Sequence, residues 1–371
     1  MKLLFWCSLF IVVYAYLLYP AWLLLRTKWK PKPVNPQPFF PKVSIIMAVR
    51  NGEKDLGEKL QNLQSLDYPV DLLQIIVASD GSTDRTNDIL RESVNSSLRP
   101  ILLSEHMGKA EALNRAVEVS TGEVVVFMDV RQRVAIDSVR LLVENFSDTS
   151  VGAVSGELLL GDGTASTQRG VGSYWKMEKS IRQWESASGS VVGATGAIYA
   201  VRRSLIPRLP AGLILDDLFI PMTVARSGSR VVFEPRAVAL DNLPARPEQE
   251  FKRKVRTLFG NYQLLRLCPW LLTAKNPLRF EFVSHKLCRL AVPFALVGAV
   301  VASVFLSGFL YRLPLAAAVC VATLGTLAWA RVPLGVASRL TDLALAFLLL
   351  NTAAMVAFLY FAVGKEQVWS R

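Results

Sequence analysis

Four long stretches of uncharged, apolar residues constrain the fold of this chain more than any other feature of its sequence. A helix needs about 20 such residues to cross a bilayer, and residues 3–25 meet that length near the N-terminus. Aromatic side chains run through this stretch, which favours an uncleaved anchor over a secretory signal. The other stretches are 290–310, 313–330 and 343–364. We expect three spans there, with a re-entrant pair in place of two of them as the alternative.

Basic residues next to these stretches predict how the chain is oriented. The positive-inside rule places segments rich in Lys and Arg in the cytoplasm. Such segments follow the first stretch, precede the second and separate the third from the fourth (Arg26, Lys28, Lys30, Lys32, Lys286, Arg289, Arg331 and Arg339). We therefore expect a multi-pass protein of the cytoplasmic (inner) membrane with its large domain in the cytoplasm. Attraction to membrane lipids explains most of the net charge of +12, and we expect no nucleic-acid partner.

The segment between the anchor and the later stretches alternates two kinds of pattern. β-type runs at 43–49, 74–79, 101–103 and 124–128 alternate with helical patterns at 53–66, 84–95 and 109–119. This alternation predicts an α/β fold, with a mainly parallel sheet that helices cover on both faces. Shorter signals predict further strands at 151–160, 197–201 and 230–233, and helices at 171–184 and 217–227. The expected organisation is an anchor (1–26), a Pro-rich linker (27–40), the α/β domain (41–265), an interfacial segment (266–286) and a membrane region (287–371).

Acidic residues stand where buried strands of this domain are expected to end. Asp80 and Asp129 each follow a β-type run, and the pair Asp216 and Asp217 comes later. In open α/β sheets, ligands bind beyond the carboxyl ends of the strands. A single aspartate at such a place is more often a helix cap or a turn residue. Their recurrence favours a functional site.

Six motifs of the domain occur in a characteristic order. They are 43–53 (VSIIMAVRNGE), 75–84 (IIVASDGSTD), 106–114 (HMGKAEALN), 193–199 (GATGAIY), 215–217 (LDD) and 253–257 (RKVRT). As a set they resemble the family 2 inverting glycosyltransferases, the group that includes the cellulose, chitin and hyaluronan synthases. The resemblance implies a GT-A fold and a nucleotide-sugar substrate.

The resemblance also implies roles for single residues. Asp80 is expected to hydrogen-bond the uracil ring of a UDP-sugar, and Arg256 to neutralise the leaving diphosphate. Asp217 is expected to be the general base, with Asp216 beside it raising its pKa by like-charge repulsion. Alternatively, the two aspartates cap the helix that begins there. The other expected nucleotide-sugar contacts are Asn51, Glu53, Lys109, Asp129 and Arg131, and the expected acceptor contacts are Gly193, Gly196 and Tyr199.

Two positions depart from the family's pattern. Where the family has Asp-x-Asp, whose second aspartate holds a divalent cation, this chain has Arg131 after Asp129. Either Asp129 with other groups still recruits Mg²⁺ or Mn²⁺, or Arg131 replaces the cation by neutralising phosphate directly. We prefer the first hypothesis because the departing diphosphate needs much charge neutralisation. Thr257 replaces the tryptophan that helps form the acceptor platform of polymer synthases, which puts processivity in doubt.

The sequence therefore predicts a membrane-integrated inverting glycosyltransferase. It would move a sugar from a UDP-sugar to a glycan or lipid-linked acceptor in polysaccharide synthesis. One alternative is the transfer of a single sugar to a polyprenyl phosphate or lipid. Another is a non-catalytic nucleotide-sugar-binding subunit of a synthase complex, which the two departures favour. The expected partners are the donor, the acceptor, membrane lipids, and a second copy of the chain or an export partner.

Overall fold

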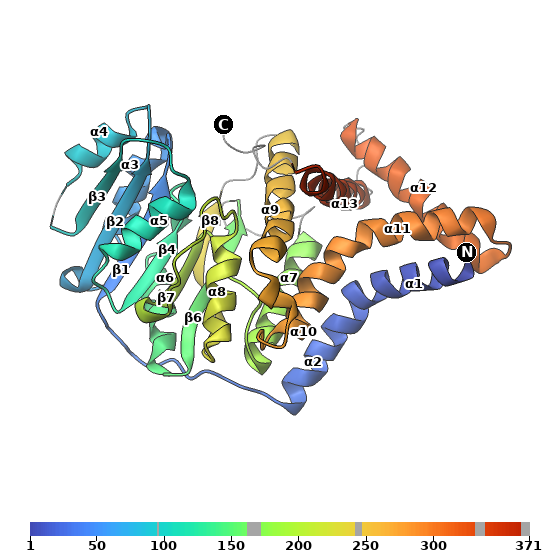
Figure 1. Ribbon diagram of the computed structural model, residues 1–371, viewed down its shortest axis with the longest axis horizontal. Helices are drawn as coiled ribbons and strands as arrows, with labels where there is room; N and C mark the ends of the chain where they lie inside the picture. Colours follow the sequence, from blue (N-terminus) through green and yellow to red (C-terminus); the bar gives the residue numbers. More distant parts are fainter. Residues whose placement is uncertain (95, 162–171, 242–246, 331–337, 365–371) are drawn as a thin grey trace.

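The computed structural model describes residues 1–94, 96–161, 172–241, 247–330 and 338–364. Its centre is an eight-stranded sheet with the order β3-β2-β1-β4-β7-β6-β8-β5 (Figure 1). The sheet is mixed: β1–β2, β1–β4, β2–β3 and β6–β8 pair in parallel, whereas β4–β7, β6–β7 and β5–β8 pair antiparallel. The strands are β1 (Val43–Val49), β2 (Leu73–Asp80), β3 (Leu98–Leu103), β4 (Val124–Met128), β5 (Arg133–Val134), β6 (Val151–Leu160), β7 (Ile198–Arg202) and β8 (Arg230–Asp241).

Helices cover both faces of this sheet because side chains alternate along each strand. In β1, Ile45 and Met47 face one apolar core and Ile46 faces the other. Helices α3 (Glu53–Gln64), α4 (Thr86–Glu92) and α6 (Ser138–Glu144) cover the first core; α5 (Lys109–Glu118) and α8 (Asp216–Arg226) cover the second.

The second core does not end at the sheet domain. It continues through Leu264 and Leu271 to Phe282, which lies at the start of a membrane helix. Two long helices lie between the sheet and the membrane helices, α7 (Gly172–Ser188) and α9 (Pro247–Leu267) (Figure 1). Single 3₁₀ turns complete the described chain at Val70–Leu72, Asn145–Ser147, Arg203–Leu205 and Pro269–Leu272. The sheet domain and the membrane region are therefore packed as one body.

Strands β1, β4 and β6 have the bounds that the sequence predicts, whereas β8 is longer. The sequence pattern ends at Phe233 because Pro235 follows shortly after it. Pro235 has no N–H for the ladder, and the pairing of β6 with β8 shifts register between Ser155 and Glu157. The ladder then resumes at Val238 and continues to Asp241. The proline thus marks a bulge and not the end of the strand.

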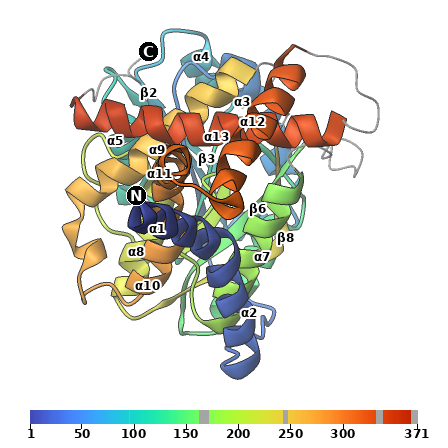
Figure 2. The ribbon, with the colours of Figure 1, turned by 90° about the vertical axis from the view of Figure 1, so that its right-hand side faces the viewer.

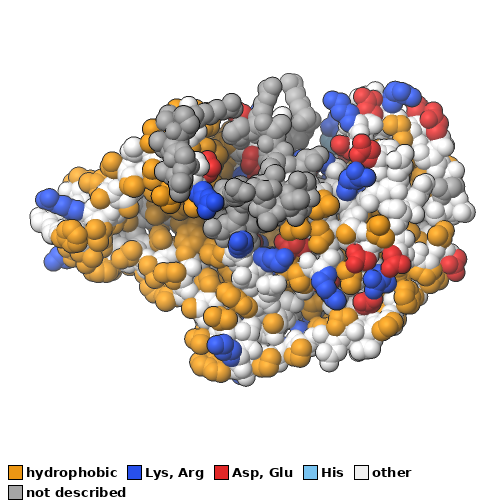
Figure 3. Space-filling view, turned by 180° about the vertical axis from the view of Figure 1, so that it is seen from behind, with side chains coloured by type: hydrophobic (Ala, Val, Ile, Leu, Met, Phe, Trp, Pro, Cys, Tyr) orange, Lys and Arg blue, Asp and Glu red, His pale blue; other side chains and the backbone are white. Residues whose placement is uncertain are grey.

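Four helices are long and apolar enough to cross a membrane, at Lys2–Trp29, Arg279–Phe305, Phe309–Trp329 and Ser338–Ala362. They comprise α1 (Lys2–Val13), α2 (Tyr19–Trp29), α10 (Arg279–Glu281), α11 (Cys288–Phe305), α12 (Phe309–Trp329) and α13 (Ser338–Ala362), with π-helical turns at Tyr14–Leu18 and Phe282–Leu287. The first π-turn leads directly to Pro20, which has no N–H to continue an α-helical ladder. Exposed hydrophobic side chains gather over these helices, and charged side chains lie mainly over the sheet domain (Figure 3).

The second of these helices begins at Arg279, well before residue 290, where the apolar stretch begins. It therefore includes the last part of the expected interfacial segment. The anchor packs against it: Arg26 forms an ion pair with Glu281, and the Tyr14 hydroxyl lies 2.7 Å from Ser284 Oγ. Helix α13 crosses α1 and α11 instead of running beside them (Figures 1 and 2). It packs on α9, where Val255 and Phe259 share an apolar cluster with Ala353 and Ala357.

Candidate active site

Asp80, the last residue of β2, is buried and organises the loop before α5. Met107 N–H donates to Asp80 Oδ1 at 2.7 Å, Gly108 N–H donates to Asp80 Oδ2 at 3.0 Å, and His106 Nδ1 lies 2.7 Å from Asp80 Oδ2. Gly81 permits this close approach, because its φ is +60° and a Cβ there would lie 2.5 Å from His106 N. A carboxylate offers about four acceptor directions. The expected contact of Asp80 with a uracil ring would have to share them with this loop, and it stays a prediction.

Lys109, the first residue of α5, links the carboxylates of two other elements. Its Nζ lies 3.2 Å from Asp129 Oδ1, just beyond β4, and 3.1 Å from Asp216 Oδ1, at the start of α8. Burial alone would lower the pKa of Lys109, but the carboxylates of Asp129, Asp216 and Asp217 hold it above its usual range. The ammonium group therefore stays charged. The structure brings these four predicted site residues together.

Asp217 is held from two sides by the segment before β7. Gly196 N–H donates to Asp217 Oδ2 at 3.1 Å, and Ala194 N–H donates to the Asp217 carbonyl at 2.7 Å. Gly193 has a φ of +135°, and a Cβ at Gly196 would lie 3.2 Å from Asp217 Oδ2. These glycines therefore shape the surroundings of the carboxylate, and their contact with an acceptor stays a prediction. Burial, followed by the charge of Asp216, raises the pKa of Asp217 to about 7.

Tyr199 does not contact the acceptor as the sequence analysis predicts. Its side chain is fully buried in the second core and stacks on Phe127, with 4.9 Å between the ring centroids. Its hydroxyl donates to Asp216 Oδ2 at 3.0 Å. The prediction was wrong because the alternation along β7 turns this ring toward the core. Tyr199 instead positions Asp216 from the core side, through the hydrogen bond of its hydroxyl to Asp216 Oδ2.

Asn51 and Glu53 connect two loops at the same edge of the sheet. Thr83 N–H donates to Asn51 Oδ1 at 2.8 Å, and Arg85 N–H donates to Glu53 Oε2 at 3.1 Å. Asn51 has a positive φ of 52°, which asparagine tolerates better than most residues. These bonds fix the loops after β1 and β2 relative to each other. Direct contacts of the two residues with a nucleotide sugar stay predictions.

Arg131 forms an ion pair with Asp241, which is buried at the end of β8. Two further groups compensate the same carboxylate: Gln132 Nε2 donates to Asp241 Oδ2 at 3.1 Å, and Arg253 Nη1 lies 3.5 Å from it. Beneath this loop the Lys59 ammonium donates to the Gln132 carbonyl at 2.7 Å, and burial lowers the pKa of Lys59 to about 8. Arg131, Arg253 and Lys59 therefore lie around position 131, where the family's Asp-x-Asp pattern has its second aspartate.

Among the described residues, the protein's side chains alone do not form a complete divalent-cation site. Asp129 Oδ1 faces the Lys109 ammonium, and Arg131 takes the place of the second carboxylate. No group of three His, Cys, Asp or Glu side chains within the described ranges is placed to hold a metal ion. Mg²⁺ and Mn²⁺ need several oxygen ligands in close array. Substrate phosphates can supply the remaining ligands of such an ion, so the expectation that Asp129 with other groups anchors Mg²⁺ or Mn²⁺ stays a prediction.

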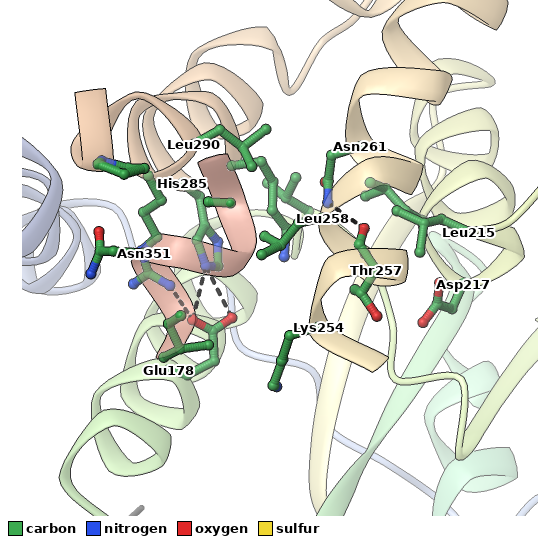
Figure 4. A pocket seen from close by; sticks show the side chains of 18 of the residues that line it. Glu178, Leu215, Asp217, Lys254, Thr257, Leu258, Asn261, His285, Leu290 and Asn351 are labelled. Atoms are coloured by element: carbon green, nitrogen blue, oxygen red, sulfur yellow. Dashed lines mark hydrogen bonds and ion pairs between the residues drawn. The ribbon is translucent and has the colours of Figure 1, made fainter. Parts of the chain in front are cut away.

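Helix α9 does not direct its predicted arginine toward the carboxylates. Arg256 is exposed, whereas Arg253, one turn earlier, reaches Asp241. The face formed by Lys254, Thr257 and Asn261 lines a cavity of about 240 Å³ that also contains Asp217 (Figure 4). The role of Arg256 at the diphosphate stays a prediction.

The far wall of this cavity comes from the membrane helices and from α7. It contains Glu178, His285, Lys286 and Arg289. Glu178 forms an ion pair with Arg289, and its Oε1 lies 3.0 Å from His285 Nε2 (Figure 4). Sequence reasoning missed these residues, together with His106, Lys59 and Asp241. The signal that was present is the row of charged residues directly before the second apolar stretch.

Comparisons with known proteins identify the family and the fold that this chain resembles. Residues 44–209 match the family described as Glycosyl transferase family 2. A probable glycosyltransferase, YdaM, of Bacillus subtilis is 26% identical over 235 residues, 60% of this chain and 55% of the relative. The poly-beta-1,6-N-acetyl-D-glucosamine synthase of Staphylococcus aureus is 23% identical over 229 residues, again 60% of this chain and 55% of the relative. The chain thus spans about half the length of the curated relatives that it matches.

A solved structure extends the likeness to the membrane helices. It is the mannosyltransferase PcManGT of Pyrobaculum calidifontis, in complex with GDP-Man and Mn²⁺. The TM-score is 0.73 at 24% identity, covering 96% of this chain and 98% of that one. At this level of identity the comparison establishes the fold. The GT-A-like α/β architecture expected from the sequence is therefore confirmed.

Proposed function

The chain carries a glycosyl transferase family 2 domain, and from this premise we propose that it is an inverting glycosyltransferase acting at a membrane. The donor is a nucleotide sugar, bound at the carboxyl ends of β1, β2 and β4. The acceptor enters through the cavity between Asp217 and the membrane helices. The observation that carries the proposal is the position of Asp217: its carboxylate adjoins the Lys109–Asp129–Asp216 cluster and lines that cavity.

Asp217 has the properties that a general base requires. Gly196 N–H occupies Oδ2, which leaves Oδ1 to accept a proton from an acceptor hydroxyl. The hydroxyl oxygen attacks the anomeric carbon, the bond from that carbon to the diphosphate oxygen breaks, and the proton passes to Asp217. Attack from the face opposite the leaving group inverts the configuration. A general base works best when its pKa lies near the working pH, because a large share of it is then ionised and it still binds a proton strongly. The pKa of about 7 for Asp217 lies in that range.

The protein's own cations neutralise the leaving diphosphate in this proposal. Lys109 is held beside Asp129 by its ion pair, and Arg131 offers a planar guanidinium half exposed at the same edge. Fixed positive groups at developing negative charge contribute strongly to catalysis. The mannosyltransferase with this fold was solved with Mn²⁺, and chelation is therefore the direct test of whether this chain needs a metal ion.

Orientation and donor complete the proposal. The catalytic domain lies in the cytoplasm in this proposal, which the basic residues beside the apolar helices support through the positive-inside rule. The uracil contact proposed for Asp80 makes a UDP-sugar the first donor to test, and GDP-mannose is the second because the mannosyltransferase binds GDP-Man. Polysaccharide synthesis is one destination for the sugar, as the name of the staphylococcal relative suggests.

A donor screen tests this function. Purified protein in native-like membranes is incubated with labelled UDP-glucose, UDP-N-acetylglucosamine or GDP-mannose, and both nucleoside diphosphate release and label in the lipid and polymer fractions are measured. We expect one donor to be consumed by the natural protein and not by Asp217→Asn. If Asp217→Asn consumes the donor as fast as the natural protein, Asp217 is not the base. If no donor is consumed, the enzyme proposal fails, and the non-catalytic nucleotide-sugar-binding role replaces it.

A further inference from the structure

The cavity beside Asp217 adjoins a second cavity that lies among the membrane helices. The first has a volume of about 240 Å³ and the second about 640 Å³. Pro293 and Asn351 line both, so the two cavities adjoin there. Side chains from α1, α11, α12 and α13 form the second cavity, and apart from Asn351 and Thr352 they are apolar (among them Leu9, Val297, Val300, Val321 and Leu348).

The first cavity carries an excess of positive charge away from the catalytic carboxylate. Lys254 of α9 lines it together with Lys286 and Arg289 of the second apolar helix. Glu178, the other carboxylate on this wall, is engaged by Arg289 and by His285. None of the ion pairs between described residues uses Lys286. Lys254 pairs with a carboxylate of its own helix, since its Nζ lies 3.5 Å from Glu250 Oε1. Lys286 is therefore the positive charge of this wall that the ion pairs between described residues leave without a carboxylate, with Lys254 beside it.

Polarity changes in a definite order from the catalytic residue to the membrane. Asp217 comes first, then the cationic wall of Lys254 and Lys286, and then an aliphatic groove. A nucleophilic hydroxyl suits the first part, an anionic group the second and a hydrocarbon chain the third. Buried waters need several polar partners, and the groove has only the side chains of Asn351 and Thr352 to offer. The sequence of surfaces matches one amphipathic molecule.

From this order we propose that the acceptor is a membrane lipid whose headgroup carries a phosphate and a free hydroxyl. The phosphate lies between Lys254 and Lys286, the chain lies in the groove between α1, α11, α12 and α13, and the hydroxyl reaches Asp217. This inference rests on the proposed function and names its acceptor. The hydroxyl oxygen bonds to the anomeric carbon, the donor's diphosphate leaves with the bonding electrons, and Asp217 takes the hydroxyl proton. Thr257 faces this cavity where the family's polymer synthases have tryptophan, which is consistent with the addition of one sugar.

A fractionation experiment tests the chemical class of the acceptor. Total polar lipid of the source membranes is separated by anion exchange into neutral and acidic fractions, and each is made into phosphatidylcholine vesicles with the purified protein. With the labelled donor found above, we expect chloroform-soluble product from the acidic fraction alone. The product should bind the anion exchanger and contain phosphorus and one added sugar by mass. A product from the neutral fraction, or a water-soluble polymer, would overturn the inference.

Two controls separate the source of the phosphate and the failure of the underlying function. Polyprenyl monophosphate offers a phosphate without a hydroxyl, so a glycosyl phosphate formed on it would overturn the role of the hydroxyl. Glycerol 3-phosphate offers the headgroup without a chain, so equal turnover on it would overturn the role of the groove. If no fraction supports consumption of any donor, it is the proposed function that fails.

Matched variants test the cationic wall. Lys286→Ala and Lys254→Ala each remove a contact with a charged group, so KM for the lipid should rise about tenfold or more while kcat changes little. Lys286→Arg should restore most of the loss. Lys252→Ala is the matched control, since this exposed lysine is two residues from Lys254 on α9 and does not line the cavity. Nucleotide-sugar affinity, measured by calorimetry, reports that each variant is folded. Equal KM values for Lys254→Ala, Lys286→Ala and Lys252→Ala would show that Lys254 and Lys286 do not bind the phosphate of the lipid.

A second pair of variants tests the groove. Val297→Trp fills it from α11 at a side chain that is 48% exposed, so the packed core is not disturbed. Val304→Trp, two turns farther on the same helix and outside the groove, is the control. We expect only Val297→Trp to raise KM for the lipid, with donor affinity unchanged. Equal transfer by both variants would show that the chain does not occupy the groove.

Discussion

The Lys109 ammonium lies 3.1 Å from a carboxylate oxygen of Asp216, which joins the start of α5 to the start of α8. Both residues stand at the carboxyl edge of the sheet, where two helices begin. The same ammonium also reaches Asp129, so one cation serves three elements of the site. In the proposed reaction this ammonium group would lie between the diphosphate of the donor and the carboxylates of Asp129 and Asp216.

Replacing Lys109 should therefore affect both chemistry and stability. Lys109→Met leaves Asp129 and Asp216 without their common cation, and we expect kcat/KM to fall by about a hundredfold. The loss of folding stability should be about 1–2 kcal/mol, less than for a fully buried pair because Lys109 is 32% exposed. Steady-state kinetics and urea denaturation measure the two effects. Lys54→Met, an exposed lysine of α3, is the control and should match the natural protein.

The pKa of Asp217 predicts an acidic limb in the pH profile. Burial, followed by the charge of Asp216, raises this pKa to about 7, and only the ionised carboxylate accepts a proton. We expect kcat/KM to fall tenfold for each unit of pH below about 7 and to level off above it. An acidic limb centred near pH 4 would mean that the carboxylate titrates normally.

The same pKa predicts an effect of Asp217 on stability. The folded protein binds this proton more tightly than the unfolded chain does, so Asp217 lowers the free energy of unfolding as pH rises from about 4 to about 7. Above pH 7 this penalty is complete. Asp217→Asn should therefore abolish transfer and yet raise Tm at pH 8 relative to the natural protein, with less difference at pH 4. A lower Tm at pH 8 would show that the ionised carboxylate is stabilised by its surroundings.

The arginine at position 131 leads us to expect that chelating agents do not inhibit sugar transfer. Because Arg131 takes the place of a metal-binding carboxylate, EDTA should leave transfer within about twofold of the untreated rate. Arg131→Gln should weaken donor affinity about tenfold, as expected for the loss of one charged contact. Arg133→Gln removes a neighbouring exposed arginine and should have no such effect. Loss of activity with EDTA and its recovery with Mn²⁺ would return the metal ion to the mechanism.

The rate of transfer should be sensitive to the addition of a single methyl group at Gly196. In Gly196→Ala the new Cβ would lie 3.2 Å from Asp217 Oδ2, so the carboxylate or the loop must shift. A displacement of the base by a few tenths of an ångström should lower kcat about tenfold or more and leave donor affinity nearly unchanged. Gly57→Ala in α3, where no atom lies within 4 Å of the new Cβ, should have natural activity.

Tyr199→Phe tests the support of Asp216. It removes the buried hydroxyl that donates to Asp216 Oδ2 at 3.0 Å and leaves that oxygen without this bond. We expect the free energy of unfolding to fall by about 1–3 kcal/mol, with a smaller effect on KM for the donor. If Tyr199→Phe changes KM for the acceptor and not stability, the ring would contact substrate after all.

Much of the fold follows from local patterns in the sequence. Strands β1, β4 and β6 were predicted with their observed bounds because each is a continuous β-type run between breaks. The alternation of strands and helices predicted the parallel half of the sheet. It did not predict that β7 enters antiparallel between β4 and β6, since pairing partners are chosen by packing and not by local propensity.

The site was predicted in part, and the reason lies in how its residues are positioned. Asp129, Asp216 and Asp217 follow from the rule that strand ends and helix starts gather at one edge, and Lys109 from the motif that contains it. Asp241 was missed because Pro235 hides the continuation of β8. Tyr199 was misassigned because its ring points into the core.

The sequence by itself determined that the chain has helices long and apolar enough to cross a membrane, an α/β domain and acidic residues at its strand ends, since hydrophobic length and periodicity are local properties. The tertiary structure alone decided what that site faces. Lys286 and Arg289 precede an apolar stretch and read as membrane-surface charges, but their helix begins at Arg279 and turns them toward Asp217. Glu178, from the distant helix α7, compensates Arg289 and His285 there. No local pattern encodes that compensation.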